Sequence, residues 1–120
     1  MTRRFIALAL ALIAAAPAVA QQPAPQLTDA QRTLLHCSAT FALVSGRQHA
    51  GDKAALAFPD VTTRGREYFV RALVELMDEA HLDHDTVVRL VQAEAARLQG
   101  SPDLLKDMPA CMASLQASGL

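Results

Sequence analysis

The sequence predicts an all-α protein, a small bundle of four or five helices stapled by one disulfide, that follows a cleaved signal peptide. Three observations predict this class. Apolar residues recur every three or four positions after residue 28, the period of a helix buried on one face. No segment after residue 20 alternates between apolar and polar residues with the period of two typical of strands. The chain has only two cysteines, Cys37 and Cys111, far apart in the sequence.

Residues 1–20 have the pattern of a secretory signal peptide. Arg3 and Arg4 form a basic start, residues 5–16 are apolar, and the run 18–20 (Ala-Val-Ala) is a small-residue cleavage site ahead of Gln21. The apolar stretch is shorter than the roughly 20 residues that span a bilayer, and no second such stretch follows. We therefore expect export by the general secretory route, rather than the twin-arginine route, to the periplasm, with no stable membrane insertion after cleavage.

The part after the cleavage site forms one domain of mild negative charge. Loss of Arg3 and Arg4 reduces the 11 Lys and Arg residues to nine, against 12 Asp and Glu, so the net charge is −3 with histidines neutral. A surface without excess positive charge argues against nucleic-acid binding. Residues 21–27 are expected to be an unstructured leader, and residues 28–120 a single helical domain.

The first helix is expected to begin at Thr28, which with Gln31 has the spacing of a capping box. It should end at Gly46 or at Gly51. Its apolar residues follow one helical stripe: Ala30, Leu34, Cys37, Phe41 and Val44.

A connector, with a helical turn over residues 53–57, should lead to a second helix that begins between Asp60 and Thr63. Gly65 near its start marks a kink, a late start or a close contact. The buried face is expected to comprise Phe69, Val70, Leu73, Leu76, Met77 and Ala80.

Two or three helices complete the bundle. Asp83 or Asp85 should cap a helix that ends at Gly100. Ser101, Pro102 and Asp103 have the pattern of a new helix start, giving a short helix over 102–107. A last helix is expected over 109–118 because proline is tolerated only in the first turn.

Cys37 and Cys111 are expected to pair, because the periplasm is oxidising. The bond would close a loop of about 75 residues, which the chain-entropy model values at about 4 kcal/mol. The alternative is a reactive thiol at Cys37 with His36 as its base. Adjacent residues on a helix point about 100° apart, which opposes that alternative.

Two polar clusters are candidate sites. His81, Asp83 and His84 lie at a helix–helix corner and could ligate Zn, Cu or Ni; the alternative is a solvated corner whose acids cap the next helix. Arg64, Arg66 and Arg71 could contact an anion or a partner. The alternative for these arginines is a wet face paired with Glu67 and Glu75.

No catalytic or phosphate-binding motif is present, so we expect neither an enzyme nor a cofactor. The leading hypothesis is a non-catalytic module that binds a protein partner, with homo-oligomerisation left open. The alternatives are a metal-binding periplasmic protein, an acid-stress chaperone-like protein and an immunity- or inhibitor-like protein.

Three stretches carry a loose resemblance to known proteins: CSATFA (37–42), RGREYF (64–69) and MPACM (108–112). The layout resembles small exported helical proteins of Gram-negative bacteria with one long-range disulfide. In plan alone it is similar to periplasmic acid-stress chaperones and periplasmic immunity proteins, although their cysteine patterns differ. The resemblance implies a helical fold and an exported location, and no activity.

Overall fold

The computed structural model describes residue 15 and residues 25–120, and the predicted signal peptide and most of the leader lie outside this part. The described residues form six helices and no strand. The helices are α1 (Asp29–His49), α2 (Lys53–Leu56), α3 (Thr62–Glu79), α4 (His84–Leu98), α5 (Asp103–Lys106) and α6 (Met108–Ala117). The all-α prediction is confirmed. The one helix beyond the predicted four or five is α2, the single turn expected in the connector.

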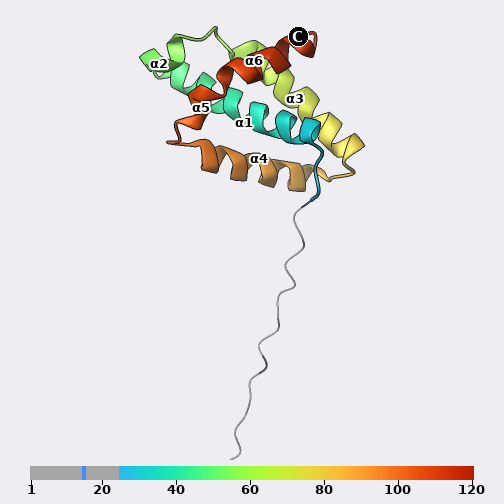
Figure 1. Cartoon of the computed structure of the whole chain (residues 1–120). Coiled ribbons are helices and arrows are strands. Elements are labelled where there is room, and N and C mark those ends of the chain that lie inside the picture. Colours follow the sequence, from blue (N-terminus) through green and yellow to red (C-terminus); the bar gives the residue numbers. More distant parts are fainter. Residues whose placement is uncertain (1–14, 16–24) are drawn as a thin grey trace, which may run out of the picture.

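Helix α1 is the central element, and each of the other five helices packs against it. Figure 1 shows α4 running along one side of α1, while α3 and α6 lie on the other sides. Five consecutive residues, 37–41, are buried, so this part of α1 is enclosed on all sides. The prediction of one buried stripe was therefore incomplete: small side chains at Ser38, Ala39 and Thr40 let neighbouring helices approach closely.

Helix starts follow the predicted capping residues. Thr28 and Gln31 form the capping box in both directions. The Asp83 carboxylate accepts a hydrogen bond from the main-chain N–H of Thr86 at 2.7 Å. The Ser101 hydroxyl accepts one from the main-chain N–H of Asp103 at 3.2 Å, but α5 begins one residue later than predicted, with Pro102 as its N-cap and no side-chain cap. Local capping chemistry thus places the first two of these boundaries.

The predicted buried face of α3 was wrong in one part. The fully buried residues are Gly65, Tyr68, Ala72 and Leu76, whereas Val70 is 54% exposed. The buried line alternates small and large residues, and Phe69, Leu73 and Met77 lie only partly buried beside it. The Tyr68 ring meets Phe41 edge to face, with centroids 5.3 Å apart.

The connector between α1 and α3 is held by one side chain, Gln48. Its Nε2 lies 3.1 Å from the carbonyl oxygen of Ala55, 3.3 Å from that of Phe58 and 2.9 Å from that of Pro59. Its Oε1 accepts from the N–H of Val61 at 3.3 Å. The amide therefore satisfies main-chain groups at both ends of the connector and fixes where α3 begins.

The last two helices close the bundle over α1. Gly100 ends α4 with a φ of 75°, a conformation that glycine adopts without strain. Met108, Cys111 and Leu115 follow at helical spacing and are fully buried. None of the helices in residues 25–120 is long and apolar enough to cross a membrane.

Candidate functional site

The predicted disulfide is present and joins α1 to α6. Cys37 and Cys111 are bonded, with their Cα atoms 5.2 Å apart, and the two residues are 2% and 0% exposed. Because both sulfurs are bonded to each other, the reactive-thiol alternative at Cys37 is wrong.

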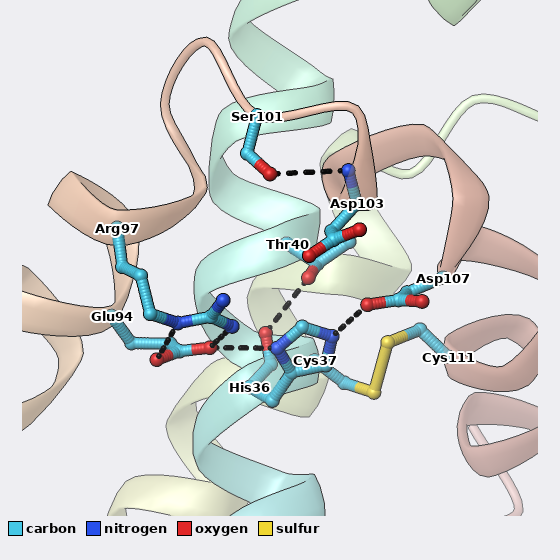
Figure 2. Close-up of polar contacts among 9 residues, drawn as sticks. All are labelled: His36, Cys37, Thr40, Glu94, Arg97, Ser101, Asp103, Asp107 and Cys111. Atoms are coloured by element: carbon cyan, nitrogen blue, oxygen red, sulfur yellow. Dashed lines mark hydrogen bonds and ion pairs between the residues drawn. A yellow bond between two sulfur atoms is a disulfide. The ribbon is translucent and has the colours of Figure 1, made fainter.

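Beside this bond, His36 joins three parts of the fold (Figure 2). Its Nδ1 lies 2.8 Å from a carboxylate oxygen of Glu94 on α4, and its Nε2 lies 3.1 Å from a carboxylate oxygen of Asp107, between α5 and α6. Arg97 donates to both oxygens of Glu94, at 2.6 and 3.1 Å. We call these four residues, His36, Glu94, Arg97 and Asp107, the His36 junction.

The four side chains of the His36 junction are linked by contacts between basic and acidic groups. Carboxylates accept hydrogen bonds, so both ring contacts are hydrogen bonds when both ring nitrogens carry a proton. The Arg97 guanidinium, and to a lesser degree His36, hold the pKa of the Glu94 carboxyl below its usual value, although partial burial opposes this. The side chains of His36 and Glu94 are 23% and 18% exposed, whereas those of Asp107 and Arg97 are 39% and 54% exposed, so only the His36–Glu94 contact is largely shielded from water.

Sequence reasoning missed the His36 junction and considered His36 only as a possible base for Cys37. The partners lie 58 and 71 positions further along the chain, and no local pattern connects positions so distant. The one available signal was chemical, since a histidine next to a core half-cystine must lie at the edge of the core.

The three predicted arginines do not act together. Arg64 donates to the main-chain oxygen of Leu120, at 3.1 Å from Nε, and Arg71 donates to that of Ser118 at 2.7 Å. Two of the three thus hold the chain after α6 against α3, instead of forming the expected pairs with Glu67 and Glu75. Arg66 lines one hollow with Phe69 and a second one with Arg71 and Leu120.

The structure does not bring His81, Asp83 and His84 together as metal ligands. All three are exposed, and the Asp83 carboxylate is engaged as the cap of α4. Nδ1 of His84 lies 3.5 Å from Asp85, and His81 has a φ of 54°. Across residues 25–120, no group of three or more His, Cys, Asp or Glu side chains is placed to hold a metal ion.

A surface groove of about 830 Å³ lies between the second half of α1 and the segment that joins α4 to α5. We call it the α1/α5 groove. Its walls are mainly apolar, with polar groups contributed by Arg47, Gln99 and Ser101. The apolar and small lining residues are Ala42, Leu43, Gly46, Ala50, Gly100, Pro102, Leu104 and Leu105.

Comparison with known proteins adds no relative. No protein-family model matches the chain, and neither the curated proteins nor the solved structures contain a match.

Proposed function

We propose that this chain is an exported, non-catalytic helical domain that binds a protein partner in the periplasm through the α1/α5 groove. The groove itself is the observation that carries the proposal. Its volume, about 830 Å³, is within the range of sites that enclose a ligand group. Its lining combines leucine and proline surface with a few polar groups, as in the centre of a protein–protein interface.

The location rests on two features that agree with each other. The basic, apolar and small-residue order of residues 1–20 is typical of an export signal. A disulfide that closes a long loop persists in an oxidising compartment.

Photo-crosslinking in intact cells tests the partner proposal. A benzophenone amino acid would replace Leu43 or Leu105 in the groove, and Val74, which is 52% exposed on α3, would be the control position. We expect one discrete adduct from the two groove positions and none from Val74. Adducts from Val74 alone, or equal yields from all three positions, would contradict the proposal.

The His36 junction favours a second candidate, an acid-responsive chaperone. The junction joins α1 to α4 and to the α5–α6 corner through two carboxylates, and in the folded protein the pKa of one of them, Glu94, is lowered, first by the hydrogen bond from Arg97. In strong acid, once all 12 carboxyl groups carry a proton, nine Lys and Arg with four His leave a charge near +13. The bundle should then loosen and expose apolar surface.

Aggregation assays at low pH distinguish the two candidates. A chaperone should suppress aggregation of an unrelated client at pH 3 and have no such effect at pH 7. If the acid-treated protein gives no protection, this second candidate is wrong, whereas the groove proposal is unaffected.

A further inference from the structure

The His36 ring has a carboxylate on each side (Figure 2). Its Nδ1 faces Glu94 at 2.8 Å, and its Nε2 faces Asp107 at 3.1 Å. An ionised carboxylate only accepts hydrogen bonds, and a neutral imidazole carries a proton on one of its nitrogens alone. A neutral ring would therefore turn a lone pair toward one of the two carboxylates. Only the imidazolium, with a proton on both nitrogens, is attracted to both.

The two carboxylates differ in how far they depend on His36. Glu94 also accepts two hydrogen bonds from Arg97, at 2.6 and 3.1 Å. The Asp107 carboxylate has no other hydrogen-bond or ion-pair partner within residues 25–120, and it is the more exposed of the two. When the ring loses one proton, the other should stay on Nδ1, where the contact is shorter and better shielded. The contact with Asp107 is then the one that is lost.

No other cation takes the place of His36 at Asp107. The charged side chains around the ring come from α1, α4 and the corner between α5 and α6. They are Arg32, Glu94, Arg97, Asp103 and Asp107. Arg32 is bonded to Asp29 and Arg97 to Glu94, so neither guanidinium is paired with Asp107. The lining that α6 adds beside the ring has no titratable group.

Asp107 directly follows α5, which supplies part of one wall of the α1/α5 groove. Helix α5 is a single turn without a side-chain cap at its start, and so short a helix is not stable by itself. Leu104 is buried and anchors it, whereas none of residues 99–103 is fully buried. Within residues 25–120, the contact between His36 and Asp107 is the one polar link between α1 and residues 99–107. This link therefore helps to fix the position of α5.

We propose that His36 is a pH-dependent latch for α5, and so for one wall of the α1/α5 groove. The imidazolium binds Asp107 and holds α5 in place. Loss of one ring proton breaks this contact and makes α5 more mobile, while the contact with Glu94 remains. Histidine is the side chain whose charge changes between about pH 5 and 8, so the latch holds in mild acid and opens above neutral pH. The movement of α5 needs no partner, and only its effect on partner binding rests on the proposed function.

NMR on the disulfide-bonded protein tests the latch without a partner. Nitrogen-15 shifts of the His36 ring should show both nitrogens protonated at about pH 5 and Nδ1 alone at about pH 8. The main-chain N–H groups of Lys106 and Asp107 bond to carbonyl oxygens at the start of α5. Their hydrogen-exchange protection, relative to that of α3, should fall about two- to fivefold between these pH values, the range expected for a partly exposed ion pair.

Asp107→Asn separates the latch from a general effect of pH. An asparagine amide can accept from Nε2 or donate to it, so the contact survives in both states of the ring and the difference in protection should disappear. Asp103→Asn removes a carboxylate from the same helix that has no hydrogen bond or ion pair with the ring, and it should keep the full difference.

Three results would overturn the latch: a His36 ring that keeps the same protons at both pH values, equal protection of α5 at both, or a difference that persists in Asp107→Asn. None of them affects the crosslinks expected from the groove, so failure of the latch and failure of the partner proposal can be told apart.

Discussion

Gly65 of α3 lies so close to Phe41 of α1 that a β-carbon at position 65 would stand 2.9 Å from the Phe41 β-carbon. The sequence left three interpretations of this glycine open, and the structure selects the close contact. The absence of a side chain lets α3 approach the most enclosed part of α1. It also lets the Tyr68 ring reach Phe41, while the Tyr68 hydroxyl and the Ser114 hydroxyl share a hydrogen bond of 2.8 Å.

Gly65→Ala should therefore destabilise the protein, although alanine favours a helix. Overpacking costs typically about 1–3 kcal/mol, of which the better helix propensity offsets about 1 kcal/mol. Gly46→Ala is the matched control, since Gly46 lies within α1 and a β-carbon at that position would meet nothing within 4 Å. That variant should gain about 1 kcal/mol. Urea unfolding of both variants measures the difference, and equal effects would contradict the close contact.

Loss of the disulfide should lower the melting temperature by more than about 10 °C, because the bond closes a long loop. The measurement is thermal unfolding with and without a reductant. A Cys37→Ala/Cys111→Ala variant supplies the control: it should melt near the reduced protein and should not respond to the reductant. A reduced protein that melts with the oxidised one would show that the bond contributes little.

Glu94 should make stability depend on pH in the acid range. Its pKa is lowered in the folded protein, first by the hydrogen bond from Arg97. The contribution of Glu94 to stability is therefore complete above its ordinary pKa of 4.5. It is lost as the pH falls through the lower pKa of the folded protein. Glu94→Gln should cost about 1–2 kcal/mol at pH 7 and less at pH 3.

The control for Glu94 is Glu67→Gln, which removes an exposed carboxylate from α3. Urea unfolding at pH 7, 5 and 3 gives the profile for each variant. The difference in the free energy of unfolding between Glu94→Gln and the parent protein should shrink with falling pH. A difference that stays constant would show that Glu94 does not make stability depend on pH.

Gln48→Ala should loosen the connector before α3 without unfolding the bundle. The amide bonds to main-chain groups at four positions between residues 55 and 61, so its loss leaves polar groups without partners and should cost about 1–2 kcal/mol. Hydrogen exchange should accelerate at Val61 in particular. Gln92→Ala on the exposed side of α4 is the comparison, and similar exchange in both variants would argue against this role.

His81→Gly should stabilise the protein. His81 has a φ of 54°, a conformation that costs a non-glycine residue about 1–2 kcal/mol. The greater freedom of glycine in the unfolded chain offsets part of this gain, so the net increase should be about 0.5–1 kcal/mol. His84→Gly in the first turn of α4 should instead lower stability. Loss of stability in both variants would show that the His81 side chain contributes more than its backbone strain costs.

The boundaries of the helices could be predicted because they depend on local chemistry. The capping residues Thr28 and Asp83, and the Ser101–Pro102 start, act on main-chain groups within a few positions. The disulfide could be predicted because only one pairing of two cysteines exists. These features need no knowledge of how the helices are arranged.

The orientation of α3 and the His36 junction could not be predicted for the opposite reason. Hydropathy assigned Val70 to the buried face, yet the close approach of Gly65 to Phe41 turns the line of Gly65, Tyr68, Ala72 and Leu76 inward. A contact between two helices, rather than hydropathy alone, thus sets the rotation of α3. His36 finds its partners only after α4 and α6 have packed, so its role follows from the tertiary structure alone.

The enclosed segment 37–41 of α1 also constrains the order of events during synthesis. α1 leaves the ribosome before any helix that covers it, and its last apolar cover arrives only with Cys111 and Leu115. The protein therefore cannot complete its core one segment at a time. Cooperative folding of the bundle should therefore wait until almost all of residues 25–120 have been made.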